Sequence, residues 1–427
     1  MADPVVSWMG SRNRLAGLLL AGLVSSLAVA EPVSVTGTLS ARHSDNIGKT
    51  EQKDSDTETS AQLSIRHVSD PGQCESELSA SVGYTSWLND FYDPESTVES
   101  GFDGSCELRP GLDWRMRNSL TEVLASSRQN DTPDNRSRRN FFSTGPVLTI
   151  PLTSVDQISA SVSFENTQYE EPAVADSKRY LGSLGWNHLF SPTLSGGISG
   201  SFSQQELNSD VETDSTSLNL NVSNIWAATS LNASLGFTRR ESQFRSSEQS
   251  SDGVVGSVTL TREVNPTTSL YVSASRQLTD QASDFTLEFE DVNFDFTEEV
   301  GVEVTAVELG LDKTFSDGTV AGVQVYGNQS DYLQTSEREN IAGLRFSVNR
   351  SIRPHLSFRS NVNYEYLRYE SNLQDDQRVI ATVGLSYSLT ADLDCTATIG
   401  HSLRESDLQS SEFDESWALF SLSYRFL

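Results

Sequence analysis

Apolar and polar residues alternate with a period of two along most of the chain. In the last segment, one face carries Ala418, Phe420, Leu422, Tyr424 and Phe426, and the other carries Leu419, Ser421, Ser423 and Arg425. The same alternation recurs at 158–165, 218–223, 231–238 and 379–388. A period of two is that of β-strands with one apolar face, whereas an amphipathic helix repeats every 3.6 residues. The pattern therefore predicts an all-β protein.

The predicted strands have the length and the polarity of membrane-crossing strands. Their apolar faces extend over about 9–11 residues, which is the length of a tilted strand in a bilayer. Their opposite faces are rich in Ser, Thr, Asn and Gly and carry little charge, as a water-filled lumen permits. A soluble sandwich, the alternative fold, would turn its apolar faces inward and place more charge outside. We therefore expect a single transmembrane antiparallel up-and-down β-barrel.

Two kinds of connection alternate between the predicted strands. Tight turns contain Pro or Gly, as in Asp70-Pro71-Gly72 and Arg109-Pro110-Gly111, while long polar loops are expected at segments such as 45–56 and 242–252. Short turns at one end and long loops at the other are typical of outer-membrane barrels, with the short turns periplasmic. Segment 284–299 is expected to form either a hairpin protruding from the barrel or a constriction in its mouth. The spacing gives about 20 strands, with roughly 18 as the alternative count.

The first 30 residues have the pattern of a secretory signal peptide. Arg12 and Arg14 precede an apolar stretch at 15–27, and Ala28-Val29-Ala30 provides a small-x-small cleavage site. A membrane-anchoring helix is the alternative, but the apolar stretch is short and a strand pattern follows it at once. We expect cleavage after Ala30 and a barrel domain at 31–427. This places the mature protein in the outer membrane of a Gram-negative bacterium, surrounded by outer-membrane lipid.

The composition limits the chemistry that the chain can perform. With 59 acidic and 30 basic residues the formal net charge is −29, which disfavours nucleic acid as a partner. Three cysteines and five histidines form no CxxC or HExxH motif, so no metal or other cofactor is predicted. A barrel hydrolase remains an alternative function, but His188 and His401 lack a partner that would make either a catalytic base. We expect a protein that is not an enzyme.

Two short motifs are similar to those of a family of porin-like outer-membrane β-barrels associated with exopolysaccharide and secretion loci. The first is Ser44-Asp45-Asn46-Ile47, at the end of the first predicted strand. The second is Asn140-Phe141-Phe142-Ser143-Thr144-Gly145-Pro146. Most of the mature chain also resembles this family in the general order of its predicted strands and loops. The resemblance implies an envelope protein linked to the export of surface polymers, and it supplies no catalytic residues.

Five arginines recur on the predicted lumen face and are candidates for selectivity: Arg66, Arg115, Arg117, Arg345 and Arg359. Charges that line a pore can favour solutes of the opposite sign, here anionic solutes or an anionic polymer. The alternative is that these arginines pair with lumen carboxylates such as Glu165, Glu308 and Glu365 and only brace the wall.

Cys74 and Cys106 are the candidates for a disulfide bond. Cys74 opens one predicted strand and Cys106 lies late in the next, so antiparallel pairing places them nearly opposite each other. Both would lie at the periplasmic end, in an oxidising compartment. Cys395 would remain a free thiol.

The chain end resembles the aromatic-x-Phe signal that barrel-assembly machinery reads on outer-membrane proteins. Tyr424 and Phe426 carry this pattern, followed by one additional residue, Leu427. An ordinary terminal strand is the alternative interpretation.

Taken together, the sequence predicts a passive, porin-like channel, or a conduit for exopolysaccharide or anionic solutes. The first predicted strand begins directly after the signal peptide, which disfavours a globular plug in the lumen. The main alternative is a structural or adhesion protein whose acidic loops bind a partner.

Overall fold

The computed structural model describes residues 33–125, 129–170, 176–208, 211–244, 247–280, 301–332, 337–370, 374–408 and 411–427. The predicted signal peptide, its cleavage site after Ala30 and the segment 284–299 lie outside these residues. Across the described ranges, no helix is both long enough and apolar enough to cross a membrane.

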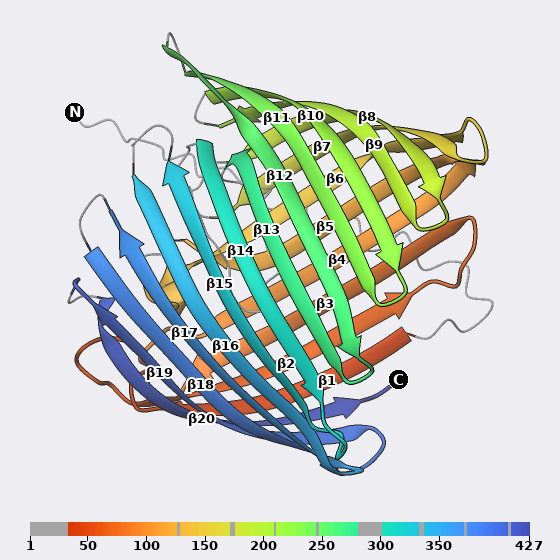
Figure 1. Cartoon of the computed structure of the whole chain (residues 1–427). Coiled ribbons are helices and arrows are strands. Elements are labelled where there is room, and N and C mark those ends of the chain that lie inside the picture. Colours follow the sequence, from red (N-terminus) through yellow and green to blue (C-terminus); the bar gives the residue numbers. More distant parts are fainter. Residues whose placement is uncertain are drawn as a thin grey trace, which may run out of the picture.

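Within these ranges, 20 antiparallel strands form one closed barrel (Figure 1). Each strand pairs with its neighbours in the chain, and β1 pairs with β20 to close the ring. The first ten strands are β1 (Val33–Ser44), β2 (Asp56–Val68), β3 (Cys74–Trp87), β4 (Glu95–Arg109), β5 (Leu112–Leu124), β6 (Arg136–Pro151), β7 (Asp156–Tyr169), β8 (Ser177–Ser191), β9 (Leu194–Leu207) and β10 (Val211–Trp226).

The second half continues in the same up-and-down order, and one 3-10 turn, η1 (Pro133–Asn135), precedes β6. The strands are β11 (Thr229–Phe244), β12 (Ser247–Asn265), β13 (Thr268–Asp280), β14 (Gly301–Thr314), β15 (Val320–Tyr332), β16 (Arg338–Arg353), β17 (Leu356–Tyr369), β18 (Gln374–Ser388), β19 (Leu393–Ser406) and β20 (Phe413–Arg425). The predicted all-β barrel with about 20 strands is confirmed, and the alternative count of 18 is wrong.

The apolar face of each strand points away from the barrel. Leu39, Leu220 and Phe420 are 60%, 58% and 52% exposed in the isolated chain, as expected of side chains that lipid would cover. Their polar neighbours point into the lumen. The even strand number allows the closing pair β1–β20 to be antiparallel, and its register keeps the faces matched: Ser40 lies opposite Ser60 on β2 and Ser421 on β20.

Outward-facing aromatic residues form two girdles around the barrel. The girdle at the short-turn end contains Trp114, Trp186, Phe190, Trp226, Tyr387 and Tyr424. The girdle toward the long-loop end contains Tyr84, Tyr180, Phe202, Phe237 and Tyr364. Aromatic girdles mark the two membrane interfaces of transmembrane barrels, so the apolar band between them is the membrane-spanning part.

The two ends of the barrel differ as the turn pattern predicts. At the short-turn end, Gly111 adopts φ +80°, and a Cβ there would lie 2.3 Å from the carbonyl oxygen of Thr149, so glycine is required. At the other end, the expected loop at 242–252 is wrong, because β11 continues to Phe244 and β12 starts at Ser247. Backbone hydrogen bonds between the two strands hold this polar hairpin together. A strand needs an apolar face only inside the membrane, so polar residues beyond the membrane can continue it.

The most deeply buried residues gather at the long-loop end. Buried polar side chains there include Ser44, Asn46, Asp56, Asn135, Asp376, Arg404 and Glu415. Buried polar groups need hydrogen-bond partners, so this end of the lumen is the place where a specific side-chain network holds the structure.

Candidate functional site: the lumen and its mouth

One part of the lumen wall is neutral and rich in hydroxyl groups. The lumen-facing positions of β9 and β10 carry no charged side chain; apart from Leu207, Val211 and Ile225 at the strand ends, they are Ser, Asn, Gln, Thr and Gly. Neighbouring strands are linked by side-chain hydrogen bonds between Ser201 and Ser217 (2.6 Å) and from Asn221 to Ser199 (2.9 Å). Ser234 and Ser257 continue this row across β11 and β12 at 2.8 Å. The hydroxyl and amide groups of such a wall can form hydrogen bonds with water, and a hydroxylated solute can replace that water.

The wall formed by β2 to β5 carries three of the predicted arginines. Arg66 lies opposite Ser34 of β1, and Arg115 and Arg117 alternate with the outward-facing Trp114 and Met116. Their lumen-facing orientation agrees with the interpretation of the sequence. Arg66 forms an ion pair with Glu77 (2.7 Å) and Arg117 forms one with Asp103 (2.8 Å). These four side chains are more than half exposed, so each pair contributes only about 0–1 kcal/mol to stability.

Arg345 and Arg359 line a pocket in the opposite wall, which β13 to β17 form. The pocket has a volume of about 830 Å³, within the range of small-molecule sites. Its other polar lining residues are Tyr271, Glu308, Asp312, Gln324, Ser347, Asn349 and Asn361. The Arg345 guanidinium lies 5.9 Å from the centre of the Tyr326 ring.

Neutral side chains donate hydrogen bonds to two lumen glutamates in this wall, Glu308 and Glu365. The Tyr326 hydroxyl donates to Glu365 at 2.6 Å, and Asn363 donates to the same carboxylate at 3.0 Å. Gln324 donates to Glu308. Across the described part of the chain, Arg345 and Arg359 therefore have no carboxylate partner, and the same holds for Arg115.

The alternative, that lumen carboxylates brace the arginines, is confirmed for Arg66 and Arg117, but their partners are Glu77 and Asp103. Of the three acids named for this role, Glu165 pairs instead with Arg179 at 2.9 Å. The sequence did not reveal Glu77 and Asp103 as the true partners. Both are cross-strand neighbours of an arginine, and identifying them requires the register of the strands.

Three segments, which we call the mouth loops, fold together at the long-loop end: 45–55, 88–94 and 129–135. The first is fastened to the seam between β1 and β20. Ser44 donates to Glu415 at 2.6 Å, and the Asn46 amide donates to the carbonyl oxygens of Thr50 (2.7 Å) and Asp414 (3.1 Å). The motif Ser44-Asp45-Asn46-Ile47 thus anchors the first loop at the point where the barrel closes.

Asp56 holds the second mouth loop. Its carboxylate is 1% exposed and accepts hydrogen bonds from the backbone N–H groups of Asn89 (3.0 Å) and Phe91 (3.3 Å). The Tyr92 ring packs edge-on against Phe91 and Trp87, with ring centres 4.8 and 5.4 Å apart. The second loop is therefore a small folded unit on β2 and β3.

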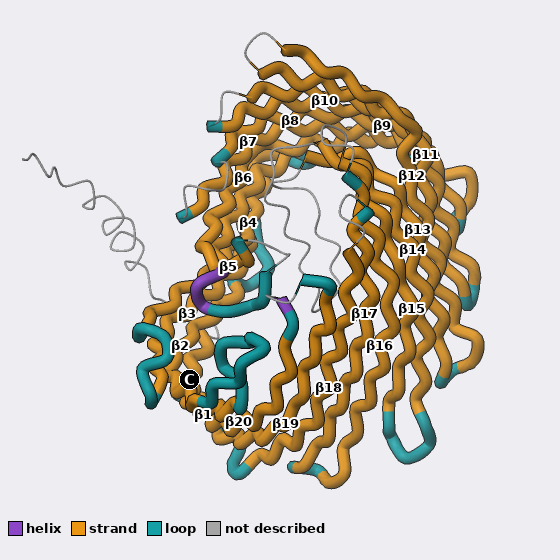
Figure 2. Tube along the Cα trace, turned by 90° about the vertical axis from the view of Figure 1, so that its left-hand side faces the viewer, coloured by secondary structure: helices purple, strands orange, loops and turns teal. Residues whose placement is uncertain are grey.

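The third mouth loop contacts both the first loop and the far wall. Asn130 donates to the carbonyl oxygen of Lys49 (2.7 Å), and Lys49 donates to that of Asp131 (2.6 Å). Arg404 of β19 donates to the Asn130 side chain at 2.8 Å. Burial raises the pKa of the Asp131 carboxyl, but Lys49 and Arg136 outweigh burial and leave this pKa below its ordinary value. Figure 2 shows described loop segments lying inside the ring of strands near β1, β5 and β20.

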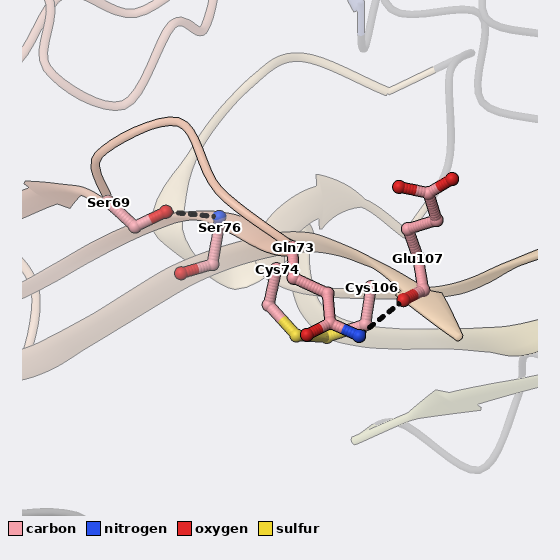
Figure 3. Close-up of a disulfide and its surroundings, with 6 residues drawn as sticks. All are labelled: Ser69, Gln73, Cys74, Ser76, Cys106 and Glu107. Carbon is pink, nitrogen blue, oxygen red and sulfur yellow. Dashed lines mark hydrogen bonds between the residues drawn. A yellow bond between two sulfur atoms is a disulfide. The ribbon is translucent and has the colours of Figure 1, made fainter. Parts of the chain in front are cut away.

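Cys74 and Cys106 form a disulfide bond between β3 and β4 in the structure (Figure 3). They occupy directly paired positions beside the short-turn end, on the outward face that Trp114 shares. The Gln73 amide donates to the Glu107 carbonyl oxygen at 2.9 Å and reinforces the same corner. Cys395 is a free cysteine.

The terminal aromatic residues lie on the seam at the short-turn end. Tyr424 and Phe426 pack edge-on with ring centres 4.9 Å apart, and both are exposed on the outer face. The Phe426 N–H donates to the carbonyl oxygen of Val35 at 2.8 Å, so the chain end is bonded to β1.

Comparison with known proteins agrees with this architecture. Residues 301–426 match the family model described as "Putative beta-barrel porin 2". The matched segment comprises β14 to β20, less than a third of the chain, and includes Arg345 and Arg359. With the closed barrel, this match identifies a porin-like β-barrel fold of the outer-membrane type. No curated protein matches the chain.

Several solved structures share the fold at low sequence identity. A mutant of the ferric enterobactin receptor from Pseudomonas aeruginosa is 11% identical with a TM-score of 0.52, and the match covers 93% of this chain and 81% of that chain. FpvA of P. aeruginosa, bound to a heterologous pyoverdine, is 10% identical with a TM-score of 0.51, covering 92% and 72%. The FrpB iron transporter from Neisseria meningitidis is 9% identical with a TM-score of 0.50, covering 93% and 83%.

Proposed function

We propose that the protein is a passive outer-membrane channel for polar solutes. The observation that carries this proposal is the hydrophilic lumen face on strands whose outer face is apolar. A barrel of this strand number lies between the 16–18 strands of open porins and the 22 strands of large plugged transporters, and it is wide enough for an aqueous path.

We propose further that the cargo includes anionic solutes, with the pocket at Arg345 and Arg359 as their contact site. Both guanidinium groups lack a carboxylate partner among the described residues, while Glu308 and Glu365 accept hydrogen bonds from the neutral donors Gln324 and Tyr326. An arginine fork pairs well with a carboxylate or a phosphate. The hydroxyl-rich wall of β9 and β10 suits a carbohydrate cargo, including the exopolysaccharide that the sequence resemblance implies.

The proposal extends to the biogenesis of the protein. Cleavage after Ala30 would release a mature chain beginning at Glu31 in a Gram-negative periplasm. The barrel-assembly machinery would then recognise Tyr424 and Phe426 on the outer face of β20 and insert the barrel. We propose no catalytic role. His188 contacts Asp156 at 2.8 Å, and His401 contacts both Ser416 (3.1 Å) and Asp414 (3.7 Å) through the same nitrogen, Nδ1, so its ring does not bridge a serine and an acid as a catalytic base does.

Swelling of proteoliposomes in glucose and in sodium glucuronate tests this function. The two solutes have similar size and differ in charge. We expect both to enter, and the double substitution Arg345→Gln and Arg359→Gln to slow glucuronate more than glucose. Replacement of the neutral wall residue Asn221 by Gln serves as the control and should leave the ratio unchanged. Absence of swelling in either solute would favour a structural or adhesion role instead.

A further inference from the structure

We infer that the mouth loops form a latch across the long-loop end of the lumen, in which Asn130 connects loop 129–135 to Arg404 on the far wall. The inference concerns regulation of the proposed channel and depends on that proposal only for its physiological meaning. The existence of the latch depends only on the contacts between loop 129–135, loop 45–55 and β19.

The path of loop 129–135 shows that it crosses the opening. The loop joins β5 to β6, whereas Arg404 belongs to β19. Six steps around the barrel wall separate β19 from β5, through β20, β1, β2, β3 and β4. At about 4.8 Å per step the distance along the wall is about 29 Å. A hydrogen bond of 2.8 Å between Asn130 and Arg404 therefore requires the loop to lie across the mouth as a chord.

The wall side of this contact is rigid. Arg404 and Asp376 form an ion pair at 2.5 Å, with side-chain exposures of 3% and 0%. Ser406 donates a second hydrogen bond to Asp376 at 2.5 Å. Two nitrogens of the guanidinium, Nε and Nη2, donate to Asp376 of β18, and the third, Nη1, donates to the side-chain oxygen of Asn130.

On the loop side, Asn135 donates to the Asn130 carbonyl oxygen (3.1 Å) and Arg136 donates to Asp131 (3.0 Å), and these bonds hold loop 129–135 to itself and to β6. Asn130 makes the bond to the far wall. Asn130 connects through its two amide atoms to Arg404 and to the Lys49 carbonyl oxygen, and Lys49 returns a bond to Asp131. A hydrogen bond with a net contribution of about 1 kcal/mol changes the equilibrium between the closed and the open mouth by about fivefold. Loss of the two Asn130 bonds should therefore raise the population of an open mouth by on the order of tenfold or more. The latch is strong enough to narrow the mouth and weak enough to be released.

Thiol labelling from outside the cell tests the latch without relying on transport. The background carries Cys395→Ser, and a reporter is introduced at lumen-facing Thr382 of β18 as Thr382→Cys. Intact cells are treated with a small charged maleimide and with a bulky polyethylene-glycol maleimide. The two latch variants are Asn130→Ala and Lys49→Ala. The control is Gln129→Ala in the same loop: the Gln129 amide is exposed and makes no hydrogen bond within the described residues.

We expect Asn130→Ala and Lys49→Ala to accelerate labelling by the bulky reagent on the order of tenfold, with Gln129→Ala unchanged. Rates equal to the parent in both latch variants would overturn the inference, as would equal acceleration by Gln129→Ala. A reporter that the small reagent cannot reach in any variant would also contradict it. If labelling responds as expected but proteoliposomes do not swell, the latch stands and the channel proposal fails.

Discussion

Replacement of Leu220 by arginine tests the assignment of the lipid-facing surface. Leu220 is 58% exposed on the outer face of β10, between Ile198 of β9 and Leu235 of β11. These neighbours are themselves exposed and apolar. The guanidinium would therefore enter a continuous hydrocarbon-facing patch without a partner.

The depth of Leu220 follows from the two aromatic girdles. Trp226 marks the short-turn girdle on β10, and Thr216 lies opposite Phe202 of the other girdle. Ten residues at about 3.4 Å each, tilted by about 40°, rise about 26 Å, which matches the apolar band of about 25 Å in known barrels. Leu220 lies about 16 Å above Trp226 on this scale, near the bilayer midplane. Arginine there should cost about 2–4 kcal/mol of folding free energy.

The matched control is Asn221→Arg, one residue further along the strand and facing the lumen. It removes the hydrogen bond from Asn221 to Ser199, which contributes about 1 kcal/mol. Free energies of unfolding are measured by urea titration in lipid vesicles, followed by tryptophan fluorescence and the heat-modifiable gel band. Equal destabilisation by the two substitutions, or greater damage from Asn221→Arg, would refute the assignment of the faces.

Thiol counting on the unreduced, denatured protein should give one free thiol, Cys395, and a count of three would exclude the Cys74–Cys106 bond. Cys106→Ser should lower stability by about 2–4 kcal/mol, given the 32-residue separation of the bonded cysteines, as urea titration would show. Simultaneous Gln substitution of Arg115, Arg117, Arg345 and Arg359 should shift the reversal potential of the open channel toward cation selectivity, and an unchanged potential would argue against a role in selectivity. Cell fractionation should recover the protein in the outer membrane with Glu31 as its first residue, whereas soluble periplasmic protein would contradict this localisation.

The fold could be predicted from the sequence because each strand carries its own signal. In Ala418 to Phe426 the alternation fixes which side chains face lipid, and turns such as that at Gly111 fix where strands end. Alternation does not define strand ends outside the membrane, where no apolar face is required. For this reason, the β11–β12 hairpin extends to Phe244 and Ser247 through residues that look like a loop.

The candidate site could be predicted only in part. The facing of Arg345 and Arg359 follows from local alternation. Their surroundings depend on which residues of β15 and β17 lie opposite Arg345, and on which residues of β16 and β18 lie opposite Arg359. The contact between Asn130 and Arg404 spans 274 residues and depends on the path of a loop. Local patterns contain no information about such a contact.

Single-channel recording in planar lipid bilayers tests the central claim, that the lumen is a water-filled path, most directly. The purified barrel should produce discrete, ohmic current steps, and Asn130→Ala should produce larger steps than the parent and than Gln129→Ala. A protein that is correctly inserted by the heat-modifiable gel criterion, but produces no current either as the parent or as Asn130→Ala, would contradict the account.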